Sequence, residues 1–282
     1  MTIKKISSKI KFICINLLEA SGIHLKEIFT VPLYLPRYVK QYIKYCLMIK
    51  SIPKNLKKYY VPSGTPYIRL KDYKFSSGSA KGHYFNQDLL VANLIYNNSP
   101  EIHLDIGSRM DGFIAHLLSF DQKTVVADVR ESEYIHPKLT SLVVDLTDIA
   151  QVSSINRKFK SISCLHTIEH FGLGRYGDKI DPLGHYNGLK NISYLLDPDG
   201  IMYLSHPTGF SRTEFNGHRV INTLDMIEIF DDLKLKPISL NIVDDEGNLK
   251  PNVILSDFYN VDTKMFNYAL AIWTLKSYNF IN

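Results

Sequence analysis

Short apolar runs of strand length alternate with longer amphipathic stretches after residue 80. Ile102, Leu104 and Ile106 form one strand-like run, which ends in the turn Gly107-Ser-Arg-Met-Asp-Gly112. The apolar run Phe113-Ile-Ala-His-Leu-Leu118 follows and has helical content. Strand, glycine turn and helix form the first half of a βαβ unit. Ligands bind beyond the carboxyl ends of the strands in an open parallel sheet, so we expect a small cofactor just after Ile106.

The same patterning predicts seven strands, at 102–106, Thr124–Val129, Leu142–Leu146, Ser161–Leu165, Ile201–Ser205, Pro237–Val243 and Tyr268–Lys276. One helix is expected over 82–97, and a second begins at 113. A third helix ends near Asp197, and a fourth covers Thr223–Leu233 with Asn222 or Thr223 as its cap. Alternating strands and helices favour a parallel α/β sheet. No helix separates the last two strands, so we expect them to pair antiparallel.

Charge divides the chain into two parts. Residues 1–58 carry twelve Lys/Arg against Glu19 and Glu27, whereas the remainder carries 21 basic and 26 acidic side chains. We therefore predict a basic helical arm and connector over 1–80 and an α/β domain over 81–282, and no nucleic-acid role. The arm either lies on an anionic membrane surface or docks on the domain.

Other features of composition narrow the setting. Pro32, Pro36 and Pro53 are expected to interrupt any long helix in the arm. The chain has no apolar run long enough for a membrane span and no signal-peptide pattern. Three scattered cysteines, Cys14, Cys46 and Cys164, favour a reducing compartment. We expect a cytoplasmic protein, with the arm available to the inner face of the membrane.

Several motifs together resemble the class I S-adenosylmethionine-dependent methyltransferases. They are Asp105-x-Gly107, Asp128 about twenty residues after that turn, and the Leu195-Leu-Asp-Pro-Asp-Gly200 turn. The segments 82–88, 103–108, 164–178 and 215–219 are similar to an uncharacterised methyltransferase-like family whose bacterial members often accompany surface-polysaccharide genes. The resemblance implies a Rossmann-like sheet of seven strands with an antiparallel last pair, S-adenosylmethionine as cofactor and a glycan-related substrate.

Candidate cofactor residues follow the first three strands. Asp105, Gly107 and Ser108 form the first turn, where the bland alternative is a tight βα turn that needs a positive φ. Asp128 offers two acceptor oxygens to a ribose diol. Asp145 resembles the adenine-amine contact of the superfamily, or it is an exposed loop acid. Arg109 replaces the second glycine of the usual Gly-x-Gly turn.

Candidate chemistry is densest after the fourth strand. His170 is the expected general base, since imidazole titrates near neutrality, with Glu169 and His166 beside it. Substrate contacts are expected from Arg175, Tyr176, Asp181, His185, His218 and Arg219. The alternative is that these side chains form a buried polar network that fixes a long loop. His166-Thr-Ile-Glu-His170 also matches a zinc-peptidase pattern, but the glycines that follow break the helix that such a site needs.

The sequence thus predicts an S-adenosylmethionine-dependent methyltransferase that O-methylates a sugar of a surface glycan or its precursor, with no metal site. Two alternatives remain. One is a non-catalytic module of the same fold in glycan assembly, which Arg109 favours. The other is a metal-dependent enzyme acting on a nucleotide-linked or lipid-linked sugar. The oligomeric state is left open.

Overall fold

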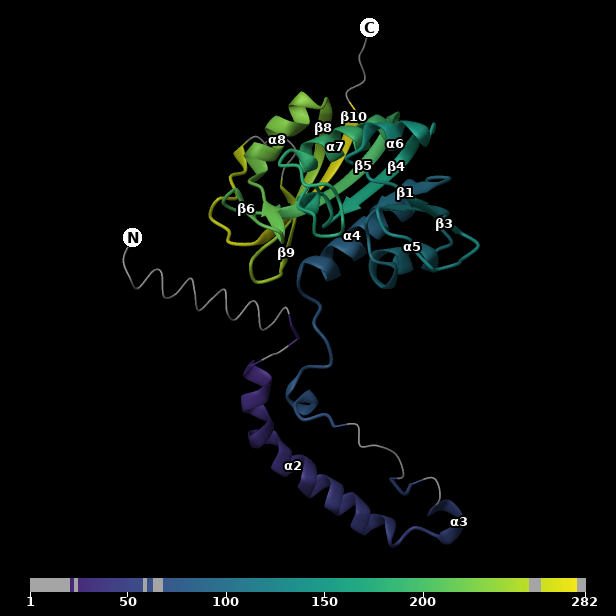
Figure 1. Ribbon diagram of the computed structural model, residues 1–282, viewed down its shortest axis with the longest axis vertical. Helices are drawn as coiled ribbons and strands as arrows, with labels where there is room; N and C mark the ends of the chain where they lie inside the picture. The colour runs from purple at the N-terminus through teal and green to yellow at the C-terminus, as the bar shows by residue number, and fades with distance from the viewer. Residues whose placement is uncertain (1–20, 23–24, 58–59, 63–67, 254–259, 278–282) are drawn as a thin grey trace, which may run out of the picture. The chain divides into compact units, whose positions relative to one another are not determined.

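The computed structural model describes residues 21–22, 25–57, 60–62, 68–253 and 260–277. The chain divides into two compact units, Met1–Ser79 and Ala80–Asn282 (Figure 1). No helix within the described ranges is both long enough and apolar enough to cross a membrane.

The N-terminal unit is built around one helix, α2 (Leu25–Ile49), followed by the short α3 (Lys54–Lys57) and a 3-10 turn, η1 (Asp72–Lys74). Helix α2 runs through Pro32 and Pro36, so the expectation that these prolines interrupt it is wrong. Each proline removes one backbone donor, but α2 is exposed around both residues, and water can satisfy the freed carbonyls. Pro53 does lie beyond the end of α2. The first twenty residues of the predicted basic helical arm lie outside the described residues.

A central sheet of eight strands organises the C-terminal unit (Figure 1). Its spatial order is β3 (Leu139–Val143), β2 (Thr124–Asp128), β1 (His103–Ile106), β4 (Phe159–Leu165), β5 (Leu196–Thr208), β10 (Ala269–Ser277), β8 (Leu235–Val243) and β9 (Leu249–Val253). Strands β1 to β5 are parallel, and β10 runs antiparallel between β5 and β8. This arrangement confirms the Rossmann-like, class I methyltransferase type of sheet.

Two details of the predicted sheet are wrong. The sheet has eight strands rather than seven, because β9 extends it beyond the polar loop Asp244–Asn248. Strand β3 begins and ends earlier than expected: Val144 and Leu146 are buried, but they follow the strand. A separate hairpin, β6 (Arg212–Glu214) and β7 (His218–Val220), was also not predicted.

Helices cover both faces of the sheet (Figure 1). One apolar cluster joins the sheet to α6 (Ile149–Ser154), α7 (Gly184–Leu195) and α8 (Thr223–Asp232). The other joins it to α4 (His83–Asn98), the π-turn η2 (Met110–Ile114) and α5 (Ala115–Ser119). Asn222 caps α8 by accepting a hydrogen bond from the Leu224 amide. The central strands, such as β1 and β4, are therefore buried on both faces, and their ends and the loops remain for function.

Candidate functional site

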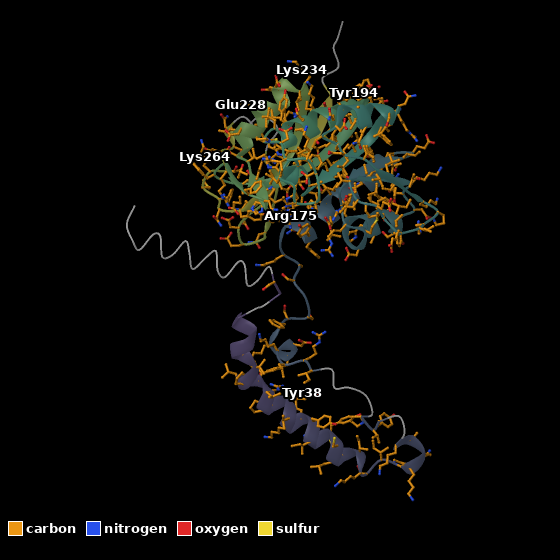
Figure 2. The ribbon with its side chains drawn as sticks, in the orientation of Figure 1. Tyr38, Arg175, Tyr194, Glu228, Lys234 and Lys264 are labelled. Atoms are coloured by element: carbon orange, nitrogen blue, oxygen red, sulfur yellow. The ribbon has the colours of Figure 1, made fainter. Side chains whose placement is uncertain are left out.

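A cavity of about 830 Å³ lies beyond the carboxyl ends of β1, β2 and β4. The chain leaves β1 toward β2 and β3 on one side and later returns to β4 on the other, so the strand order reverses here. Such switch points open a crevice for ligands. Figure 2 shows Arg175, from the loop after β4, at the opposite end of this unit from Tyr194 and Lys234.

Gly107 forms the floor of the cavity between β1 and the loop after β4. Its φ is +71°, and a Cβ there would lie 2.4 Å from Thr167 Cγ2. Only glycine fits this turn without strain, and its backbone is left open to a ligand. The predicted positive-φ requirement and the predicted place in the cavity therefore coincide at this residue.

Asp105 lies beneath this turn and does not line the cavity. Its carboxylate accepts hydrogen bonds from Ser108 N at 3.1 Å, Ser108 Oγ at 2.8 Å and Ser163 Oγ at 2.5 Å. Burial raises its pKa to about 6. Asp105, placed by the sequence among the cofactor contacts, thus holds the glycine turn in shape, and Ser108 is the member of this pair that reaches the cavity.

A buried histidine extends the support under the turn. His103 is fully buried, and its two ring nitrogens lie 2.8 Å from Ser161 Oγ and Ser163 Oγ on the neighbouring strand. Burial lowers its pKa to about 3, so the ring is neutral. His103, Ser163 and Asp105 form a continuous hydrogen-bonded path across β1 and β4.

Asp128, the last residue of β2, and Asp145, just beyond β3, both line the cavity, where we expect acids at strand ends. Asp128 accepts hydrogen bonds from Arg130 N and Nε, each at 2.9 Å, and from a terminal guanidinium nitrogen of Arg130 at 2.7 Å. Asp145 accepts from Thr147 N at 2.8 Å and Thr147 Oγ1 at 2.7 Å. Both carboxylates are therefore fixed in position by their own loops.

Arg109, which replaces a glycine of the usual turn, lies on the rim. Its guanidinium pairs with Asp111 at 2.7 Å, and the side chains are 77% and 72% exposed. The long cationic side chain therefore points to solvent and leaves the cavity open. The sequence feature that favoured a non-catalytic module does not block the site.

Glu169 is the centre of the polar cluster after β4. It is fully buried and its Oε1 lies 2.7 Å from His166 Nδ1 and 3.7 Å from His170 Nε2. Burial works to raise the pKa of Glu169, but the two imidazoles and the hydrogen bond from His166 outweigh this and lower the pKa. Its second oxygen, Oε2, is buried and finds no hydrogen-bond partner in the part of the chain that the structure describes.

The two histidines differ in what they can offer to a ligand. His166 adopts φ +51°, and its Nε2 lies 3.0 Å from His83 Nδ1, so both of its ring nitrogens are engaged. His170 Nδ1 donates to the Gly217 carbonyl at 2.7 Å. Because this proton sits on Nδ1, the neutral His170 ring presents the Nε2 lone pair, and burial lowers the pKa of His170.

The motif from His166 to His170 does not form the helix that a zinc peptidase needs. It contains only the 3-10 turn η3 (Ile168–His170). Within the described residues, no group of three or more His, Cys, Asp or Glu side chains is arranged to hold a metal ion.

The six predicted substrate residues separate into two groups. Arg175, Tyr176 and His218 line the cavity. Asp181 instead accepts hydrogen bonds from Leu183 N in its own loop and from Asn187 on α7, and His185 lies on α7 with a buried Nδ1 that has no partner among the described residues. Arg219 is buried and donates to backbone carbonyls of the loop between β4 and α7. These three lie outside the cavity wall.

Several cavity residues were not predicted. Helix α4 contributes Tyr84, Gln87 and Asp88, and Tyr268 enters from the segment before β10. Gln87 Oε1 accepts from Ser205 Oγ at 2.6 Å, and burial raises the pKa of Asp88. The only signal for the α4 residues was the Gly82–Asp88 motif of the family resemblance.

A family model described as "Caenorhabditis protein of unknown function, DUF268" matches residues 115–235, from α5 through α8. No curated protein matches the sequence.

Solved structures of methyltransferases are similar at low identity. N-methyltransferase NodS from Bradyrhizobium japonicum WM9, in complex with S-adenosyl-l-homocysteine, is 11% identical over 70% of this chain and 89% of its own, with a TM-score of 0.47. An S-adenosylmethionine-dependent methyltransferase from Clostridium acetobutylicum ATCC 824 is 13% identical over 73% of this chain and 95% of its own, with a TM-score of 0.46. Because these identities and TM-scores are low, function is inferred from the cavity itself.

Proposed function

We propose that this chain is an S-adenosylmethionine-dependent methyltransferase that O-methylates a sugar hydroxyl of a surface glycan or its precursor. One observation carries the proposal: a single cavity is lined both by the strand-end residues suited to the cofactor and by a carboxylate–imidazole cluster suited to an alcohol. Bringing both groups to one crevice is what a group transfer between two bound molecules requires.

The cofactor half of the cavity fits S-adenosylmethionine. Gly107 leaves its backbone open to a close approach, and the Asp128 carboxylate lies at the carboxyl end of β2, where a ribose diol can donate to it. The neighbouring wall after β3 is formed by Asp145, Leu146 and Thr147, where the adenine ring of the cofactor would lie. Bound there, the cofactor would supply an electrophilic methyl group, and the chain's residues would orient it.

The acceptor half fits a hydroxyl-bearing ligand. Glu169 is among the cavity residues, and its Oε2 is a buried acceptor for which the described residues provide no donor, which is costly unless a ligand supplies one. A hydroxyl can donate to Glu169 or pass its proton to His170 Nε2. The rings of Tyr84, Phe171, Tyr176 and Tyr268 line the same cavity and offer apolar faces to a sugar ring.

Methyl transfer to glycan or nucleotide-sugar acceptors from labelled S-adenosylmethionine tests the proposal. Replacing His170 with alanine is expected to reduce the rate by about 100-fold or more, with affinity for S-adenosylhomocysteine retained. The matched control is His136→Ala, outside the cavity. Cofactor binding without methyl transfer to any hydroxyl acceptor would refute the proposed O-methyltransferase activity. The alternative of a non-catalytic module with the same fold would then hold.

A further inference from the structure

We propose that helix α2 binds the surface of an anionic lipid bilayer. The inference is independent of the methyltransferase proposal, because it concerns only the N-terminal unit. It rests on an exposed apolar stripe, on a flank of basic side chains and on a strong excess of basic over acidic residues along this part of the sequence.

The apolar stripe follows the helical repeat along one side of α2. Leu35, Val39, Ile43 and Leu47 recur every four residues, and all four side chains are exposed, Ile43 by 54% and Leu47 by 56%. Pro32 and Pro36 widen the stripe at its start, where they line a shallow groove with Leu35, Val39 and Ile43. Such a continuous apolar patch on an exposed helix is typical of an interaction surface.

The segment that packs on α2 leaves this stripe open. Tyr73 of η1 packs edge-on against Tyr34. The central guanidinium carbon of Arg37 lies over the Tyr73 ring, 3.3 Å from the ring centroid. Lys74 donates to the Tyr34 hydroxyl at 3.0 Å. Tyr34 and Arg37 lie roughly opposite the stripe at 100° per residue. These contacts between η1 and α2 therefore use the other side of the helix.

Charge identifies the partner. Lys40 and Lys44 are exposed on the flank of the stripe. Helix α2 has one acid, Glu27 in its first turn, and the following residues 28–71 contain nine Lys/Arg and no Asp or Glu. A second copy of the helix would bring like charges together, whereas an anionic bilayer accepts both the apolar stripe and the lysines.

Tyrosines border the other flank of the stripe. Tyr38, labelled in Figure 2, stacks on Tyr42 with ring centroids 6.3 Å apart. Tyrosine rings prefer the headgroup region of a bilayer, where the ring is buried and the hydroxyl is hydrated. The three kinds of side chain around α2 thus match the layers of one membrane interface.

The test is co-sedimentation of the full chain with vesicles of phosphatidylcholine alone and of phosphatidylcholine mixed with phosphatidylglycerol. We expect binding only to the mixed vesicles, weakened by salt. The variant Lys40→Gln/Lys44→Gln is expected to bind roughly 25-fold more weakly, about fivefold for each lysine. The variant Val39→Asn/Ile43→Asn is expected to lose binding, since the stripe no longer enters the interface.

Matched controls are Lys123→Gln and Ile135→Asn, which change an exposed lysine and an exposed apolar side chain outside α2. Both are expected to bind as the wild type does, and circular dichroism checks that all variants fold. Equal binding to both vesicle types, no binding, or unaltered binding by the α2 variants would overturn the proposal. So would concentration-dependent self-association that the Val39→Asn/Ile43→Asn change abolishes, because the stripe would then belong to a second copy.

Discussion

Gly107 shows at the scale of one residue how backbone geometry shapes the cavity. It combines a positive φ with contact to Thr167, whereas Gly177 has φ +88° and nothing within 4 Å of the position that a Cβ would take. We expect Gly107→Ala to lower the free energy of unfolding by about 2–4 kcal/mol, from backbone strain plus overpacking. Gly177→Ala carries the backbone cost alone, about 1–2 kcal/mol.

Urea unfolding of the two glycine variants measures this difference. Adding Thr167→Ala to Gly107→Ala should restore part of the lost stability, because it removes the methyl group that the new Cβ meets. Equal losses at Gly107 and Gly177 would show that the turn does not press against Thr167.

Arg130 competes with any diol that binds Asp128. Its backbone amide and guanidinium already occupy three of the roughly four acceptor positions of the carboxylate. The ion pair is 55% exposed on the arginine side and is therefore weak, about 1 kcal/mol or less. We expect Arg130→Ala to tighten S-adenosylhomocysteine binding by up to about fivefold, as measured by calorimetry. Weaker binding would instead assign Arg130 a direct contact with the ligand.

Arg219 acts at the scale of an element, because it ties the loop between β4 and α7 to β7. Its guanidinium donates to the carbonyls of Phe171 at 2.6 Å and Pro182 at 3.3 Å, with longer contacts to Glu169 and Asp181. Lysine lacks the planar set of donors that reaches all of these carbonyls. The substrate role expected from the sequence thus becomes a role in positioning the loop that carries His170.

We expect Arg219→Lys to cost about 1–3 kcal/mol of stability and to speed hydrogen exchange across residues 167–183. The control is Arg212→Lys, which also bonds to backbone carbonyls but lies on the surface. Comparable exchange in the two variants would contradict the loop-fixing role.

Strand and helix patterning predicted most of the sheet, and physical reasons explain where it did not. Strand β3 lies at the sheet edge with only partial burial, so its own residues gave a weak apolar signal and the buried residues after it gave a stronger one. Cavity residues at strand ends, such as Asp128 and Asp145, followed from topology. Tyr84 and Tyr268 did not, because only tertiary packing brings α4 and the start of β10 to the cavity.

The polar segment after β4 illustrates the other limit of the sequence. The sequence shows that the segment around His166, Glu169 and His170 is rich in side chains able to act in catalysis. It does not show which side chains of residues 166–185 face the cavity. Turns with positive φ at His166, Gly172 and Gly174 reverse the chain, so no simple period sorts cavity residues from loop residues. Asp181 lies in the loop and His185 on α7, and neither lines the cavity.

At the scale of the whole molecule, buried histidines make stability depend on pH. Burial lowers the pKa of His103 to about 3 and of His83, His185 and His206 to about 4, from 6.5. Below pH 6.5 the unfolded chain takes up protons at these rings while the folded chain does not. The free energy of unfolding therefore decreases as the pH is lowered. Each histidine contributes up to about 1.4 kcal/mol per pH unit.

Asp105 works in the opposite direction. Its pKa is raised from 3.8 to about 6, so its stabilisation is complete below pH 3.8 and is lost as pH rises through 6. Four histidines outweigh this one carboxyl, and we expect the urea midpoint to decrease from about pH 7 to about pH 5. A midpoint that is constant or rises over this range would contradict the buried, neutral state of these rings.

The most direct test of the proposed cofactor site is calorimetric titration of S-adenosylmethionine and S-adenosylhomocysteine into the wild type, Asp128→Ala and the control Asp231→Ala, an exposed acid on α8. We predict micromolar binding, about −8 kcal/mol, to the wild type and control. Loss of the charged acceptor in Asp128→Ala should weaken binding by at least about tenfold. Absence of binding to the folded wild type, or equal binding by all three proteins, would contradict the assignment of this cavity to the cofactor.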